Sequence, residues 1–135
     1  TKEREHPAKS VAFMWKHASA PKVASNLRYV SLQAPKSTKL AQELVPKADL
    51  VADGLDNLET RYVFNDACVK YGKPWIYTAV LATYGLTMSI LPEKGPCLRC
   101  LFPDPPRPGT ILTCAEAGIL GTVPKVLACL QQLRL

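Results

Sequence analysis

The chain has 135 residues, which is enough for one hydrophobic core and suits a single domain or part of one. Hydrophobic residues make up 47% of it and charged residues 21%, so the composition excludes an intrinsically disordered chain, and no apolar run reaches membrane-spanning length. The net charge is +6, but the surplus of Lys and Arg is scattered over residues 1–47 and forms no continuous run, which favours a solvated surface over a phosphate contact.

The five cysteines indicate a reducing compartment, because an odd number of thiols fits poorly with a disulfide framework. We therefore expect a cytoplasmic protein that uses cysteine for metal binding or catalysis, with no nucleic-acid and no membrane partner. A small basic zinc module that binds nucleic acid ranks last, because it would need a complete ligand set and a salt-sensitive affinity.

The first half of the chain alternates between predicted helices and strands. Residues 10–20 predict a helix that Pro21 ends, and residues 27–32 alternate as in a strand. Residues 38–47 predict a short helix, and residues 50–52 a short buried strand. The clearest helix follows, over residues 57–71, because its apolar side chains fall at helical spacings.

The second half of the chain begins with a predicted strand-turn-strand pair. Residues 75–80 and 86–91 are rich in β-forming side chains, and the segment between them places a turn near residues 84–85. Residues 92–110 form a proline-rich loop, and the apolar segment 115–135 is predicted to be helical at least from Pro124 onward. This alternation of strands and helices indicates an α/β layer architecture.

Two acids lie between the predicted strand at residues 50–52 and the helix that follows it. Asp53 and Asp56 therefore stand at the carboxyl end of a strand, where open α/β sheets bind ligands and where carboxylates hold Mg²⁺ beside phosphates. Asp56 and Glu59 also match a capping box, and spacing alone favours a helix cap over a metal ligand. Arg61 has three open roles: bracing one of the acids, contacting phosphate, or lying on the surface.

Cys97 and Cys100 have the spacing of a zinc knuckle, in which two thiolates hold one face of a tetrahedral ion. A redox pair is the weaker alternative, because a proline-rich loop follows the second cysteine. Structural zinc needs four ligands and no second CxxC follows in the sequence, so the pair supplies half of a site.

Cys114 precedes a segment of small residues, 115–118, and a helix that begins there would favour its thiolate. The alternative is a buried thiol that acts as a small apolar residue, which is the usual environment of a free cysteine. Cys68 and Cys129 lie in apolar helical patterns, and for them we expect only that buried role.

The order of these motifs resembles the ThiF/MoeB/HesA family, relatives of the ubiquitin-activating enzymes. ADLVADGLDNLETRYVFNDACVKYGKPWIY is similar to the family's strand, Asp-Asn motif and helix, GPCLRCLFPDPPRPG to its first zinc CxxC, and TCAEAGILGTVPKV to its catalytic-cysteine segment. Residues 48–126 are closely family-like, and residues 1–47 match only in outline. The resemblance implies part of a dinucleotide-fold-like domain, with a mostly parallel sheet flanked by helices and a zinc-knuckle loop at 92–110.

Members of this family use MgATP to adenylate the C-terminal glycine of a ubiquitin-like sulfur carrier protein, in thiamine, molybdopterin or tRNA-thiolation metabolism. The resemblance implies that Asp56 corresponds to the acid that engages Mg²⁺ and the ATP phosphates, with Asp53, Asn57 and Arg61 beside it in the nucleotide site. Lys9 is the nearest candidate for the family's phosphate-contacting lysine.

The resemblance also assigns the cysteines. Cys114 corresponds to the catalytic cysteine that joins the carrier covalently in some members, and Cys97 and Cys100 correspond to two of the four zinc ligands.

The sequence departs from the family at two motifs, because it holds neither a G-x-G-x-x-G phosphate loop nor a second CxxC. We therefore interpret residues 1–135 as an incomplete domain of this family, inactive alone, whose intact parent is an adenylyltransferase that forms a homodimer or heterodimer. The alternative is a non-catalytic pseudoenzyme or scaffold subunit that binds a ubiquitin-like partner.

Overall fold

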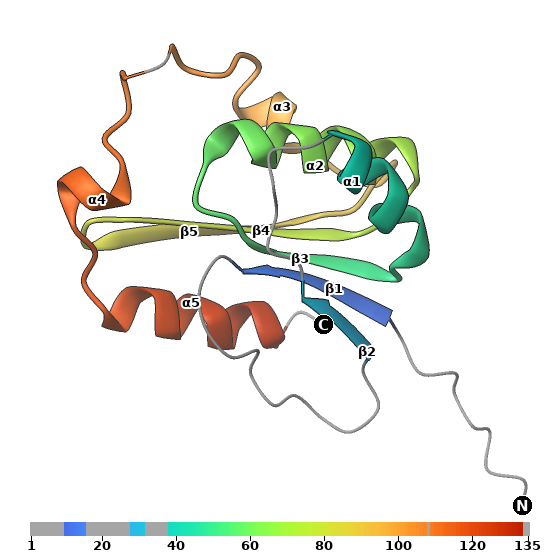
Figure 1. The fold of residues 1–135 in the computed structure, drawn as a ribbon, viewed down its shortest axis with the longest axis horizontal. Helices are drawn as coiled ribbons and strands as arrows, with labels where there is room; N and C mark the ends of the chain where they lie inside the picture. The colour runs from blue at the N-terminus through green and yellow to red at the C-terminus, as the bar shows by residue number, and fades with distance from the viewer. Residues whose placement is uncertain (1–9, 16–27, 32–37, 108, 134–135) are drawn as a thin grey trace, which may run out of the picture.

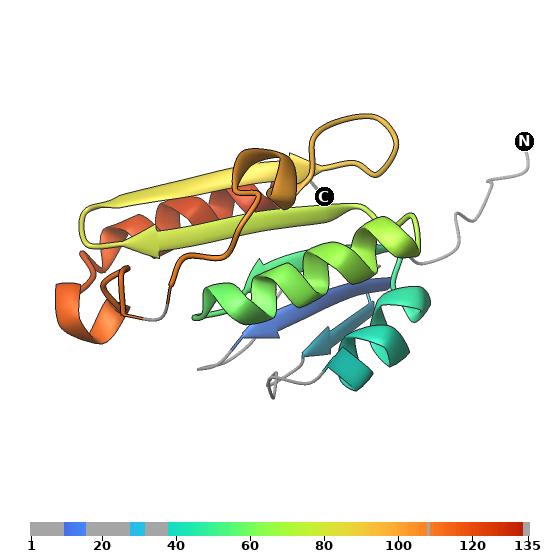
Figure 2. The same ribbon diagram turned by 90° about the horizontal axis from the view of Figure 1, so that it is seen from above.

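A computed structural model describes residues 10–15, 28–31, 38–107 and 109–133 of the chain. Its elements, in chain order, are β1 (Ser10–Trp15), β2 (Arg28–Ser31), α1 (Thr38–Leu44), the 3-10 turn η1 (Val45–Lys47), β3 (Leu50–Gly54), α2 (Leu58–Lys70), β4 (Trp75–Leu81), β5 (Tyr84–Ile90), α3 (Leu98–Leu101), α4 (Cys114–Ala117) and α5 (Thr122–Gln132). Figure 1 and Figure 2 show one sheet with α1, α2 and α3 on one face and α5 on the other.

The sheet has five strands in the order β2-β1-β3-β4-β5. β1 pairs in parallel with β2 and β3, β3 pairs in parallel with β4, and β5 runs antiparallel beside β4. The predicted α/β architecture and mostly parallel sheet are therefore confirmed. Because β2 and β3 lie on opposite sides of β1, the strand order reverses there, and ligands of open α/β sheets bind outside the carboxyl ends of strands at such a point.

The helix predicted over residues 10–20 is wrong in its first half. Ser10–Trp15 forms β1, and residues 16–20 lie outside the described part of the chain. The sequence alternates Val11, Phe13 and Trp15 with smaller or flexible residues, and backbone pairing with strands on both sides outweighs the local helical pattern. The strand predicted at residues 27–32 is confirmed as β2.

The helix α2 confirms the prediction for residues 57–71 and covers the core. Phe64 and Cys68 turn inward, where they pack with Val51 and Trp75 of the sheet. Complete burial of a side chain such as Phe64 contributes roughly 1.5–3 kcal/mol. The helix ends at Gly72, whose φ of +63° is the left-handed conformation that only glycine adopts without strain.

The β4–β5 hairpin turns two residues earlier than the sequence predicted. The turn lies at Ala82, whose φ is +52°, while Gly85 lies within β5. Gly85 is needed for packing, since a Cβ atom there would collide with the side chain of Leu127 on α5. The missing side chain lets α5 approach the sheet closely.

The C-terminal third contains three helices joined by irregular segments. The proline-rich loop carries the short helix α3, α4 ends before Gly118, and the helix predicted from Pro124 onward is confirmed as α5. Cys129, expected to be buried, is exposed on α5, so that prediction is wrong. In the described part of the chain, no helix combines the length and apolarity that crossing a membrane requires.

Candidate functional site

Asp56 lies in the connection between β3 and α2, at the carboxyl end of the strand, and its side chain is exposed. The cap of α2 is Asn57, whose Oδ1 accepts a hydrogen bond from the Thr60 N–H at 2.8 Å. The capping role that spacing assigned to Asp56 is therefore wrong. Asn57 also donates from Nδ2 to Asp56 Oδ1 at 3.2 Å, so the cap holds the acid at the surface.

Asp53 lies at the end of the same strand but is buried, with 2% of its surface exposed. Its Oδ1 accepts from the Leu55 N–H at 2.8 Å, and its Oδ2 accepts from Arg61 Nε at 2.9 Å and from the Thr78 N–H at 3.2 Å. Burial raises the pKa of Asp53, while Arg61 and the two backbone N–H groups oppose that rise. These contacts place Asp53 behind Asp56, where it supports the loop without facing solvent.

Arg61 projects from the first turns of α2 into the same buried region. Besides Asp53, its guanidinium contacts the carbonyl oxygens of Leu55 and Thr78 through Nη2, and it lies 5.4 Å from the ring centroid of Tyr77. Of the three roles that the sequence left open, the described contacts correspond to bracing Asp53. Arg61 thereby joins α2 to β3 and β4.

Gln131 belongs to this cluster and was missed by the sequence analysis. It lies on α5, is 2% exposed, and donates from Nε2 to the carbonyl oxygens of Asp53 and Ile76 at 2.9 and 3.1 Å. Its only sequence signal is a polar residue four positions after Leu127, on the same face of the helix, which does not reveal its partners.

Cys114 opens the short helix α4, whose capping box joins Thr113 and Glu116. The thiol is half-buried, and its Sγ lies 3.5 Å from the carbonyl oxygen of Val80 on β4. The segment docks on the hairpin tip, since Ala82 donates to the carbonyl of Gly118 at 3.2 Å. Figures 1 and 2 both place α4 at the end of the sheet where β3 leads into α2.

The Cys97 and Cys100 thiols face each other across the turn that begins α3, with Sγ atoms 3.8 Å apart. Two thiolates bound to one tetrahedral zinc at 2.3 Å would be separated by about 3.8 Å, so the pair fits half of such a site. Burial opposes ionisation of Cys97, but hydrogen bonds from Cys100, Arg99 and Asn65 outweigh it and lower the pKa of that thiol. Among the described residues, no group of three or more His, Cys, Asp or Glu side chains is arranged to hold a metal ion.

The turn that carries this pair is clamped onto α2. Asn65 Oδ1 accepts from the Leu98 N–H at 2.9 Å, and Arg99 forms a two-pronged ion pair with Asp66 through bonds of 2.7 Å. The guanidinium of Arg99 also lies 4.9 Å from the ring centroid of Tyr62. The pair is therefore preorganised by protein contacts.

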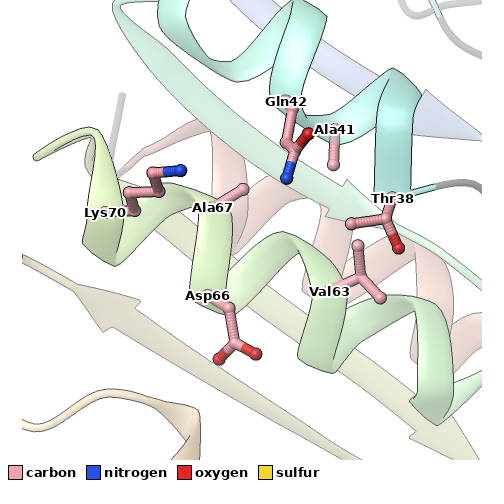
Figure 3. A pocket seen from close by; sticks show the side chains of 7 residues that line it. All are labelled: Thr38, Ala41, Gln42, Val63, Asp66, Ala67 and Lys70. Carbon is pink, nitrogen blue, oxygen red and sulfur yellow. The ribbon is translucent and has the colours of Figure 1, made fainter.

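Lys9 lies outside the described residues. A shallow pocket of roughly 260 Å³ lies between α1 and α2, and Figure 3 shows Gln42 pointing across it while Asp66 points away from α1. None of the predicted site residues lines this pocket. Cys68 is enclosed in the core, where burial and the nearby Asp53 raise the pKa of its thiol to about 12, as expected for a structural cysteine.

Comparison with known proteins yields a family and several named relatives. The chain is 47% identical over 93 residues to the adenylyltransferase and sulfurtransferase MOCS3 of Mus musculus, a match that covers 69% of this chain and 20% of that protein. It is 43% identical over 89 residues to the SAMP-activating enzyme E1 of Haloferax volcanii, covering 66% of this chain and 33% of the other. It is 44% identical over 95 residues to the sulfur carrier protein adenylyltransferase of Thermus thermophilus, a match that covers 67% of this chain and 35% of that protein.

The chain thus spans about a fifth to a third of the length of these relatives. The model of the ThiF family matches residues 12–135, which include β3, the Asp56 loop and both cysteine motifs. The resemblance carried by these motifs is confirmed, and the chain belongs to the ThiF family.

Proposed function

We propose that this protein is an adenylyltransferase that uses ATP to activate the C-terminal glycine of a ubiquitin-like sulfur carrier protein. The observation that carries this proposal is the position of Asp56. Its exposed carboxylate follows β3 at the carboxyl end of the sheet, between the buried Asp53–Arg61 pair and the Asn57 cap. The names of the three relatives, each an adenylyltransferase or an activating enzyme, support the same reaction class.

The reaction converts a poor leaving group into a good one. A carboxylate oxygen of the carrier attacks the α-phosphorus of ATP, pyrophosphate leaves, and the product is an acyl-adenylate. A sulfur nucleophile then attacks the acyl carbon, and AMP leaves with the bonding electrons. The ubiquitin-like protein that supports the reaction identifies the carrier. It thereby also identifies the pathway, which is thiamine, molybdopterin or tRNA-thiolation metabolism.

Asp56 is the residue that we assign to Mg²⁺ and the ATP phosphates. An exposed carboxylate fits this role, because Mg²⁺ in nucleotide sites is held by one or two carboxylates together with phosphate oxygens and water. When bound, the ion would neutralise charge that develops on the departing pyrophosphate. Asp53 and Arg61 act from behind by fixing the loop, and Asn57 fixes it from the helix side.

The cysteines have two separate proposed roles. Cys114 is the proposed acceptor thiol, supported by its location at the same end of the sheet as the Asp56 loop. Cys97 and Cys100 are the proposed half of a zinc site, supported by their separation of 3.8 Å. Two further ligands would complete that site, and the assembled protein would act as a homodimer or heterodimer.

Carrier-dependent exchange of pyrophosphate into ATP tests the proposal. The intact gene product is mixed with each ubiquitin-like sulfur carrier of the same organism, and Asp56→Ala is compared with Asp49→Ala, an exposed acid at the opposite end of β3. We expect a loss of about 10²-fold or more for Asp56→Ala and little change for Asp49→Ala. Undiminished exchange in Asp56→Ala would remove Asp56 from the mechanism. No exchange in the wild type with any carrier would instead favour a non-catalytic scaffold subunit.

A further inference from the structure

The strands β3 and β4 separate at the position of Asp53. They pair at Val51 with Trp75 and at Ala52 with Ile76, and no further pair follows between them. Directly beyond, the carbonyl oxygens of Asp53 and Ile76 both accept hydrogen bonds from Gln131 Nε2, at 2.9 and 3.1 Å. A single side-chain amide therefore joins the two strands where their backbone ladder ends.

The same gap is bridged from the other face of the sheet by Arg61. Its side chain contacts Asp53 Oδ2 and the carbonyl of Thr78, and the Thr78 N–H itself donates to Asp53 Oδ2. Arg61 comes from α2 and Gln131 from α5, which lie on opposite faces in Figure 1 and Figure 2. The carboxyl end of β3 is thus held between two helices by buried polar contacts.

We propose that Gln131 is a positioning residue for Asp56. This inference rests on the proposed function and deepens it, because it assigns a role to a side chain that does not touch the nucleotide. Gln131 fixes the backbone of Asp53, whose carboxylate fixes the Leu55 N–H at 2.8 Å, and Leu55 directly precedes Asp56. Two hydrogen bonds therefore separate the amide of Gln131 from the backbone that carries the proposed ATP-site acid.

A glutamine is not required at this position for packing. Leu127, about one turn earlier on α5, already packs the helix against Gly85. A buried amide is unfavourable unless its hydrogen bonds are made, and here both donors meet carbonyls of different strands. The chemistry of the side chain, not its size, explains its presence.

The position of Gln131 also links the two parts of the proposed site. The helix α5 follows the Cys114 segment, which itself docks on Ala82 at the hairpin tip. Gln131 joins the C-terminal turn of α5 to β3, so this helix forms a frame that connects the Cys114 segment with the strand leading to the Asp56 loop. A small displacement of that frame affects the transition state more than ground-state binding, because alignment of the reacting groups is most demanding there.

The test compares Gln131→Met with Leu127→Ala, a variant of the same helix that removes packing but leaves the carbonyl contacts intact. Both are assayed for carrier-dependent ATP–pyrophosphate exchange in the intact protein, well below their melting temperatures. For Gln131→Met we expect kcat to fall roughly tenfold or more, with the KM for ATP changed by less than about twofold. For Leu127→Ala we expect a lower melting temperature with kcat and KM within about twofold of wild type.

Hydrogen exchange gives a second readout that needs no activity. The Leu55 and Thr78 amides should be protected in the wild type and should exchange at least about tenfold faster in Gln131→Met. A kcat within twofold of wild type, or unchanged exchange of these two amides, would overturn the proposal. If the variant does not fold, the wild type alone provides the test. Hydrogen exchange of the Leu55 and Thr78 amides as fast as in exposed loops would also overturn the proposal. If the wild type shows no activity, the proposed function is contradicted. The hydrogen-exchange experiment still tests the placement of Gln131.

Discussion

Asn65 Oδ1 accepts a hydrogen bond from the backbone N–H of Leu98 at 2.9 Å, and both residues are buried. The bond joins α2 to the first residue of α3, inside the turn that spaces the two thiols. Cys97 and Cys100 flank that turn, so the amide of Asn65 helps to set their separation of 3.8 Å. The spacing of the two thiols therefore depends in part on a helix that carries neither of them.

Replacing Asn65 with Leu should destabilise the fold because it leaves the buried Leu98 N–H without an acceptor. A buried unsatisfied donor costs about 1–3 kcal/mol, so we expect a loss of that size in the free energy of unfolding. Chemical denaturation measures it. Val69→Ala, an exposed substitution on the same helix, is the control, and a loss in Asn65→Leu no larger than that in Val69→Ala would show that the acceptor is not what matters.

The Arg99–Asp66 ion pair should make docking of the CxxC turn sensitive to acid. Hydrogen bonds from Arg99 lower the pKa of Asp66 below its ordinary value of 3.8. The stability that the pair contributes is therefore complete above pH 3.8 and is lost as the pH falls through the lower, folded-state pKa. Since both side chains are about half exposed, the contribution is less than about 1 kcal/mol.

Acid titration of wild type and Asp66→Asn, followed by denaturation at each pH, measures this contribution. Wild type should be the more stable protein at neutral pH, and the difference should disappear well below pH 3.8. A difference that stays constant through this range would exclude the ion pair as its cause.

Local signals predicted α2 well, because its apolar spacing, its cap and Gly72 all lie within one stretch of chain. They misassigned the cap by one residue, because Asp56 and Asn57 are both good capping residues. The cap is the residue directly before the helix with an extended backbone, and that residue is Asn57. The β1 segment was misread because its partners, β2 and β3, lie far along the chain.

The buried cluster around Asp53 was only half visible in the sequence. Arg61 follows Asp53 by only eight residues, so the sequence could suggest the pairing. Gln131 could not, because its two acceptors lie 78 and 55 residues away and are backbone carbonyls, which every residue has. Contacts of that kind depend on how the helix packs on the sheet.

The Cys97–Cys100 pair should bind a divalent thiophilic metal in the intact protein. Titration with Co²⁺ should produce a thiolate-to-metal absorption band, because ionised sulfur ligands give such bands and Co²⁺ occupies tetrahedral zinc sites. Cys97→Ser should abolish the band. Cys129→Ser, which removes an exposed thiol on α5, should leave it intact, and an undiminished band in Cys97→Ser would place the metal elsewhere.

Removing the positive charge beside Asp53 should make the stability of the protein fall more steeply as the pH rises. Burial raises the pKa of Asp53, and Arg61 is the main group that opposes this rise. In Arg61→Met the opposition is lost, so the folded state holds the Asp53 proton more tightly than the unfolded chain does. Between the unfolded pKa and the higher folded pKa the folded state then binds more protons, and stability decreases with increasing pH.

At neutral pH we expect Arg61→Met to lose about 3–5 kcal/mol, because it leaves a buried carboxylate without its partner. The loss should shrink as the pH falls toward 4, where protonation relieves the buried charge. The double variant Asp53→Asn with Arg61→Met is the control, since a neutral amide at position 53 removes the titrating group. Denaturation of wild type, Arg61→Met and the double variant across this range should show the steepest pH dependence in Arg61→Met and a weaker one of the same sign in wild type. An equally steep dependence in the double variant would assign it to another group.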